Sequence, residues 1–177
     1  MNDHGLIPVV IRFYAPDDRE SVEKFRCSWR PWEKDAQRVI RDAPSIIESD
    51  GLELIVAEHE GKVVGVAVFR LFDQPECMIY SLGVVSKLWD KGIGTRLKEA
   101  VMVEATLRRP GCIFTSLVFR RNHRMIRVNE KLHAVTEINP DDREYLLTYV
   151  TINIDPAPIF SWIVRSTGTP PRSIGDP

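Results

Sequence analysis

Cysteines and long apolar runs are both scarce in this sequence of 177 residues. The cysteines are too widely spaced for a Cys-x-x-Cys zinc pattern, and their odd number leaves no complete disulfide framework. They are Cys27, Cys77 and Cys112. No apolar run approaches the ~18 residues that a membrane-spanning helix needs. We therefore expect a soluble protein of the reducing cytoplasm, with each cysteine packed as a small apolar residue.

An excess of charge of one sign is also missing, since the formal net charge is −1 and the isoelectric point is about 6.4. Such a chain has no overall attraction to nucleic acids or to a membrane surface. Residues 1–8 do not resemble a signal peptide. With 44% hydrophobic residues, the chain can bury one core. We expect a single domain over residues 1–165 and a flexible tail, rich in Pro, Gly, Ser and Thr, over residues 166–177.

Hydrophobic periodicity predicts alternating strands and helices. Gly61 is typical of a short hairpin loop, and Pro44 is expected to lie beyond the end of a helix. The predicted strands cover residues 9–14, 52–59, 63–71, 78–85, 113–119, 134–138 and 145–153. The predicted helices cover residues 20–29, 33–42, 95–106 and 122–132.

The most informative segment is the glycine-containing turn at residues 88–97, which joins a predicted strand to a predicted helix. Gly92 and Gly94 lie at the helix N-terminus, where free backbone N–H groups and the helix dipole favour a bound phosphate. The NTPase phosphate loop and the dinucleotide fingerprint do not match, because Thr95 and Leu97 stand where those motifs need other residues. On the glycines alone, an ordinary strand-to-helix turn remains the alternative.

Residues 89–94, Trp-Asp-Lys-Gly-Ile-Gly, resemble motif A of the GNAT superfamily of acyl-CoA-dependent N-acetyltransferases. Residues 122–132 are similar to the family's Asn-containing helix that ends in Glu-Lys-Leu. Trp89 replaces the commonest Arg or Gln, which favours the branch that includes ribosomal-protein N-terminal acetyltransferases. Asn129 stands where many members have a catalytic Tyr, and His133 replaces the glycine that follows the helix.

The resemblance implies an α/β (α+β) fold with a central mixed sheet of six to seven strands and about four helices. The fourth and fifth strands should separate, and the pantetheine arm of CoA should lie between them. The implied reaction moves an acetyl group from acetyl-CoA to a primary amine of a small molecule or a protein, by direct attack in a ternary complex. No metal is implied, and a homodimer is possible, since residues 159–164 form an apolar patch outside the family core.

The resemblance also assigns the cofactor contacts residue by residue. The backbone of the fourth strand should meet the pantetheine, the turn should hold the pyrophosphate, and two asparagines should lie near the arm. These residues are Leu82, Gly83, Val84, Trp89, Lys91, Gly92, Ile93, Gly94, Thr95, Asn122 and Asn129. Glycine within a strand often marks a bulge or a close backbone approach, so Gly83 suggests one of these, although a merely tolerated glycine is the alternative.

Acetyl transfer needs a neutral amine and a protonated leaving thiol, so an acid or a base is expected near the fourth strand. Glu76 is the first candidate, and Tyr80 and Ser81 are the others. Ordered water is the alternative to all three. Trp32 and Glu33 are expected in the acceptor pocket, because an aromatic wall and a negative charge suit an amine.

Two other functions stay open on the sequence. A non-catalytic acyl-CoA-binding regulatory module is one, because the familiar Tyr is absent. A nucleic-acid-binding domain is the other, through the basic cluster formed by Arg120, Arg121, Arg124 and Arg127. This cluster lacks the interleaved aromatic residues that stack on bases, so nucleic acid is the weaker of the two.

Overall fold

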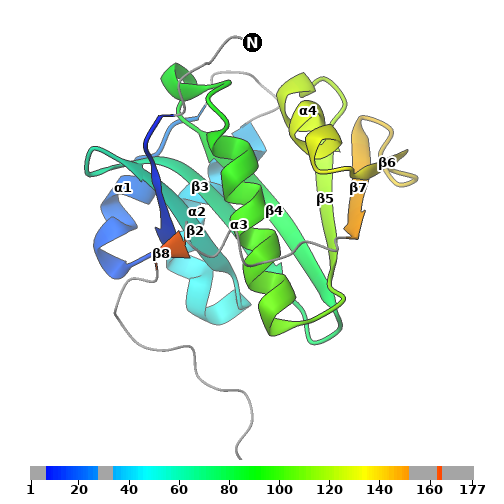
Figure 1. Cartoon of the computed structure of the whole chain (residues 1–177), viewed down its shortest axis with the longest axis horizontal. Coiled ribbons are helices and arrows are strands. Elements are labelled where there is room, and N and C mark those ends of the chain that lie inside the picture. Colours follow the sequence, from blue (N-terminus) through cyan, green and yellow to red (C-terminus); the bar gives the residue numbers. More distant parts are fainter. Residues whose placement is uncertain (1–6, 28–33, 152–162, 165–177) are drawn as a thin grey trace, which may run out of the picture.

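The computed structural model describes residues 7–27, 34–151 and 163–164 of the chain. Its strands are β1 (Val10–Phe13), β2 (Glu53–His59), β3 (Lys62–Leu71), β4 (Glu76–Val84), β5 (Ile113–Phe119), β6 (Val135–Ile138), β7 (Tyr145–Thr151) and β8 (Ile163–Val164). Its helices are α1 (Arg19–Glu23), α2 (Lys34–Asp50), α3 (Ile93–Arg108) and α4 (His123–Lys131), with 3-10 turns η1 (Pro16–Asp18) and η3 (Ser86–Leu88) (Figure 1).

A single mixed sheet with the strand order β6-β7-β5-β4-β3-β2-β1-β8 forms the centre of the fold. The β4–β5 and β1–β8 pairs are parallel, and the other neighbouring pairs are antiparallel. The predicted fold class, a mixed sheet with four flanking helices and parallel fourth and fifth strands, is confirmed. The described sheet has eight strands because the two-residue β8 joins its edge.

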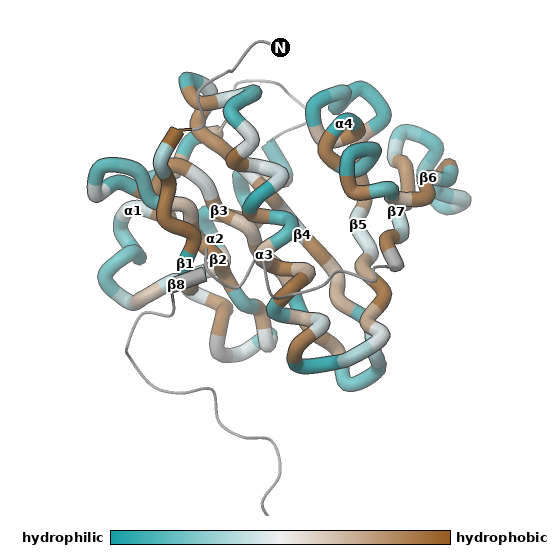
Figure 2. The backbone as a smooth tube through the Cα atoms, viewed as in Figure 1, coloured by the Kyte–Doolittle hydropathy of each residue, from teal (hydrophilic) through white to brown (hydrophobic). Residues whose placement is uncertain are grey.

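Helices cover both faces of the central strands. In β2, Ile55 packs in the core under α3, whereas its neighbours Leu54 and Val56 pack in the core under α1 and α2. A strand that is buried on both faces has a continuous apolar sequence. Figure 2 shows this as hydrophobic colour along the central strands, with hydrophilic colour on many of the loops and outer helix turns. None of the described helices is long and apolar enough to cross a membrane.

Helix α2 corrects one prediction, because it continues through Pro44 to Asp50. A proline inside a helix removes one hydrogen bond and costs roughly 3 kcal/mol. Ile40 and Ala43 before the proline are fully buried, and Ile47 after it packs against the same core. This contact with β3 and β4 outweighs the local cost, so the helix does not end where the proline suggested.

The first helix also differs from its prediction, and the hairpin is tighter than expected. Helix α1 ends at Glu23 rather than near residue 29, because Phe25 leaves the helix axis and is buried in the core under α2. The β2–β3 hairpin turns on Glu60 and Gly61, which both have positive φ (51° and 71°). Two such residues are typical of a type I′ turn.

Strands β4 and β5 separate soon after they begin. Their pairing runs only from Glu76 with Ile113 to Met78 with Thr115, although β4 continues to Val84. The register of β4 against β3 shifts at Tyr80, which is the extra residue of a bulge. Gly83 therefore does not mark a bulge. A Cβ there would lie 2.8 Å from Ile40 Cδ1, so this glycine permits close packing of α2 on the strand.

Candidate functional site

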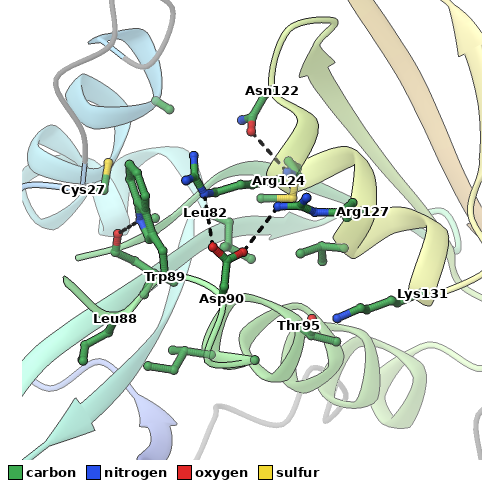
Figure 3. A pocket seen from close by; sticks show the side chains of 18 residues that line it. Cys27, Leu82, Leu88, Trp89, Asp90, Thr95, Asn122, Arg124, Arg127 and Lys131 are labelled. Atoms are coloured by element: carbon green, nitrogen blue, oxygen red, sulfur yellow. Dashed lines mark hydrogen bonds and ion pairs between the residues drawn. The ribbon is translucent and has the colours of Figure 1, made fainter. Parts of the chain in front are cut away.

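A cavity of about 210 Å³ lies at the end of the fold where β4 has left β5 (Figure 3). Its walls come from the last residues of β4, the turn at residues 88–92, the start of α3 and one side of α4. Cys27 and Ala36 line it from the side of α1 and α2. Two of the walls are the glycine turn and the Asn-containing helix, so the structure brings together the two segments that the sequence singled out.

The glycine turn leads directly into α3. Gly92 is the N-cap residue with φ 76°, a conformation that L-residues rarely adopt, and the helix begins at Ile93. The first N–H groups of a helix have no partner within it and carry the positive end of the helix dipole. Gly92, Ile93, Gly94 and Thr95 all line the cavity. The N–H groups of this wall can donate hydrogen bonds to the oxygen atoms of a phosphate.

Gly94 keeps space open between α3 and β4. A Cβ at this position would lie 3.6 Å from Leu82 Cδ2, 3.8 Å from Val84 Cγ2 and 4.0 Å from Val128 Cγ2. A larger side chain would therefore fill the space that these residues now border. Gly94 and the end of β4 thus border the same cavity.

Among the residues that the structure describes, no strand lies beside the edge of β4 that faces this space. Leu82, Gly83 and Val84 pair with Ala67, Val66 and Gly65 of β3 on one side, and β5 has already turned away on the other. An extended strand with one unpaired edge can bind an amide-bearing arm as an additional strand would. The three predicted pantetheine contacts all line the cavity.

Trp89 and Arg124 connect the turn to α4. The Trp89 indole Nε1 donates to Val84 O at 2.8 Å, and the Arg124 guanidinium lies 4.1 Å from the ring centroid. Asp90 holds Arg127 at 3.4 Å and Arg124 at 3.8 Å (Figure 3). Arg124 Nε is buried and has no hydrogen bond within the described part of the chain. Its distance of 3.8 Å from Asp90 Oδ2 is too long for a hydrogen bond, so this N–H can still donate to an anionic ligand.

The two asparagines of α4 have different environments. Asn122 lines the cavity and caps the helix, its Oδ1 accepting from Met125 N at 3.2 Å. Asn129 is 1% exposed and accepts a hydrogen bond from Lys98 Nζ of α3. Burial lowers the pKa of Lys98 to about 8. Asn129 does not border the cavity itself, and its Nδ2 has no partner among the described residues.

The predicted catalytic residues do not line this cavity. Glu76 lies at the paired end of β4 and accepts from Thr115 Oγ1 at 3.2 Å. It is six residues before Leu82, which corresponds to roughly 20 Å along an extended strand. Tyr80 is 40% exposed at the bulge, and Ser81 is buried and donates to Ala36 O at 2.9 Å. Of the three, the latter two lie where β4 begins to separate.

The remaining predicted residues have no described contact in the site. Lys91 belongs to the turn but does not border the cavity. Trp32 and Glu33 lie outside the described residues, as does the predicted tail at 166–177. No group of three or more His, Cys, Asp or Glu side chains in residues 7–27, 34–151 and 163–164 is placed to hold a metal ion.

Two arrangements in and near the site were not predicted from the sequence. The stacking of Arg124 on Trp89 joins the two motifs, and the only sequence signal for it was the density of arginines after Phe119. The burial of Lys98 had no signal beyond its spacing, one helical turn after Gly94. Both depend on how α4 packs against the turn and α3.

The chain matches one protein-family model and many solved structures. Residues 18–134 match the model of the acetyltransferase (GNAT) family. The PaiA N-acetyltransferase from Thermoplasma acidophilum in complex with coenzyme A is 14% identical, with a TM-score of 0.66 over 82% of this chain and 100% of that chain. No curated protein matches.

Two further solved structures share the fold of this chain. The ribosomal-protein-S18-alanine N-acetyltransferase from Escherichia coli is 17% identical, with a TM-score of 0.63 over 83% of this chain and 96% of its own. The Campylobacter jejuni N-acetyltransferase PseH in complex with acetyl coenzyme A is 16% identical, with a TM-score of 0.58 over 81% and 99%. The family expected from the two motifs is confirmed, and this chain belongs to the acetyltransferase (GNAT) family of acyl-CoA-dependent enzymes.

Proposed function

We propose that this enzyme transfers the acetyl group of acetyl-CoA to a primary amine, by direct attack of the amine within a ternary complex. The observation that carries the proposal is the separation of β4 from β5 next to the N-terminus of α3. The free strand edge suits the amide groups of pantetheine, and the helix start suits a pyrophosphate. One continuous cavity thus matches both parts of a single long ligand.

The residues of the chain divide the binding task. Backbone groups of residues 82–84 would pair with the pantetheine, and the amides of residues 91–95 would hold the pyrophosphate. Arg124 and Arg127 add positive charge on the opposite wall, where their present partner is Asp90. Acetyl-CoA supplies the activated thioester. The protein places that thioester near the bulge at Tyr80, where the gap between the strands begins.

The acceptor pocket is proposed on the side of α1 and α2. Cys27 and Ala36 border the cavity, and the chain between them contains Trp32 and Glu33. This placement of the two flanking residues supports the prediction that Trp32 and Glu33 contact the amine. The acceptor class is a small-molecule amine or a protein N-terminus.

Glu76 remains a proposal for the general base, with ordered water as the alternative. The residue is intermediate in exposure and lies on the strand that carries the bulge. Glu76→Gln keeps the shape and removes the basic oxygen. Glu76 would be supported if kcat of the wild type rises as a carboxylate ionises and Glu76→Gln lowers kcat. Turnover of the variant equal to that of the wild type across the pH range would assign proton removal to water.

Binding and turnover test the proposed function separately. Acetyl-CoA at about a hundredfold over Kd should stabilise the protein by ~2.7 kcal/mol, a rise in Tm of roughly 5–10 °C. A panel of amines should then release CoA thiol, detected with a thiol reagent. Gly92→Ala should lose the Tm rise, while Gly111→Ala should keep it, because Gly111 has nearly the same φ (77° against 76°) but does not line the cavity. No Tm rise in the wild type at millimolar acetyl-CoA would refute the proposal.

A non-catalytic acyl-CoA-binding module is the second candidate. Two observations favour it: Asn129 replaces the familiar Tyr, and the predicted catalytic residues lie outside the cavity. Such a module would give the same Tm rise with acetyl-CoA but would release no thiol with any amine. Nucleic-acid binding has less support, because Arg124 and Arg127 already face Asp90 at the cavity.

A further inference from the structure

Lys98 is a buried cation in the middle of the enzyme. Its side chain is 2% exposed, and it is among the largest fully buried side chains of the described chain. Its ammonium group donates a hydrogen bond to Asn129 Oδ1. Lysine is almost never fully buried without a carboxylate partner, because an unpaired charge loses its hydration. A fully buried lysine whose hydrogen-bond partner is a neutral amide is therefore a candidate for a functional role.

Charged neighbours do not account for the state of Lys98. Burial is the single cause of its lowered pKa, and no charged group in the described part of α4 or of the sheet contributes. Arg127 of α4 pairs with Asp90, and Glu76 of β4 accepts from Thr115. The amide of Asn129 also has a second, unused donor, since its buried Nδ2 has no partner among the described residues. Lys98 and Asn129 thus form a pair of N–H donors with spare capacity.

The position of this pair follows from the register of α3 on β4. Gly94 lies against Leu82 and Val84, and Lys98 is four residues later, about 6 Å farther along the same face of the helix. Because α3 connects the parallel strands β4 and β5, it runs back along β4 toward Met78. Six ångströms correspond to about two residues of a strand, so Lys98 is about level with Ser81, next to the bulge at Tyr80.

The surroundings of the gap on this face are polar as well as buried. Ser116 is the first residue of β5 beyond the pairing with β4, it is 7% exposed, and its hydroxyl is 2.6 Å from Thr148 Oγ1. Ser116 lies two residues after Phe114, which belongs to the core under α3. Buried hydrogen-bonding groups of α3, α4, β5 and β7 thus lie on the side of the sheet that α3 covers.

We propose that the Lys98 ammonium, oriented by Asn129, donates the proton that the departing CoA sulfur needs. The inference rests on the proposed function, because it places the thioester at the inner end of the gap. In the reaction the amine nitrogen forms a bond to the carbonyl carbon, and the C–S bond breaks with its electron pair on sulfur. One proton passes from Lys98 Nζ to sulfur. The new amide loses a proton to water, and Lys98 regains one from solvent, so protons and charge balance.

Lys98→Met tests the proton donor, because it keeps the length of the side chain and removes the charge. General acid catalysis contributes roughly 10²–10⁴-fold, so kcat should fall at least about a hundredfold. The KM for acetyl-CoA should change by less than about threefold. The rise in Tm on binding acetyl-CoA should change by no more than a few degrees. Asn129→Asp is an isosteric second variant that should also lower kcat, because a carboxylate holds the lysine proton. Lys62→Met, at an exposed lysine of β3, is the matched control.

A spectroscopic readout without turnover completes the test. The ultraviolet absorbance of the thiolate in the complex with CoA reports the pKa of the bound thiol. An ammonium beside the sulfur should lower that pKa by about one unit or more relative to the Lys98→Met complex. Equal thiol pKa values in the two complexes, or an unchanged kcat in Lys98→Met, would overturn the proposal. If the wild type does not bind acetyl-CoA, the proposed function is refuted instead.

Discussion

The buried ammonium of Lys98 makes the stability of the protein depend on pH in an unusual direction. In the unfolded chain a lysine has a pKa of about 10.5, whereas burial lowers the pKa of Lys98 to about 8 in the folded protein. Between these values the unfolded state binds more protons than the folded state. The free energy of unfolding should therefore rise from pH 8 to pH 10.5 through this group, and the contribution should be absent below pH 8.

The size of the effect follows from the shift. The fall of the Lys98 pKa from 10.5 to about 8, at 1.36 kcal/mol per pH unit, corresponds to about 3 kcal/mol in the free energy of unfolding. This is a large fraction of the stability of a typical domain. The group is 2% exposed, so solvent screens it little. Two cysteines act in the opposite direction above pH 9, because burial raises the pKa of Cys77 and raises that of Cys112 to about 11.

Urea denaturation of the wild type and of Lys98→Met, at intervals from pH 7 to pH 10.5, isolates the lysine. The cysteines contribute equally to both proteins, so the difference between the two free energies of unfolding measures Lys98 alone. The wild type should gain about 3 kcal/mol relative to the variant across this range. A difference that stays constant with pH would show that Lys98 keeps its ordinary pKa in spite of its burial.

Three further predictions concern the cavity and the opposite end of the sheet. Gly94→Val should lower acetyl-CoA affinity at least tenfold with little change in Tm, because the valine side chain enters the space beside Leu82 and Val84. Isothermal titration calorimetry would measure the affinity. An affinity equal to that of the wild type would refute the proposed path of the pantetheine arm. Arg124→Ala should weaken CoA binding by about 1 kcal/mol and reduce the salt dependence of binding, since the substitution removes a charge and a cation–π contact with Trp89. The measurement is the binding constant in low and in high salt. An unchanged salt dependence would contradict this prediction. Asp18→Asn should destabilise the fold by ~1–3 kcal/mol at pH 7, because it breaks the paired hydrogen bonds from Arg12. Burial raises the pKa of Asp18, but hydrogen bonds from Arg12 and from Ala15 N–H outweigh it and leave the pKa below its usual value. The wild type should therefore lose this stabilisation only below about pH 4, and thermal unfolding of both proteins from pH 3 to pH 7 should show the difference closing as the pH falls.

The sequence by itself determined the family, the order of most elements and the location of the glycine turn that begins α3. These features are written in local chemistry: a glycine with positive φ at residue 92, apolar periodicity in the strands, and an asparagine cap at residue 122. Each depends on residues close together in the chain. The same holds for the hairpin at Glu60 and Gly61, where two positive φ angles fix the turn.

The tertiary structure decided which side chains the site contains. Pro44 stays inside α2 because contacts with distant strands outweigh its local cost, and the bulge falls at Tyr80 because β3 sets the register of β4. Glu76 lies at the paired end of its strand, away from the cavity. Lys98 has the spacing of an ordinary helical lysine, and only the packing of α4 against α3 removes it from water. Burial and charge state are set by residues far apart in the sequence, so local patterns do not report them.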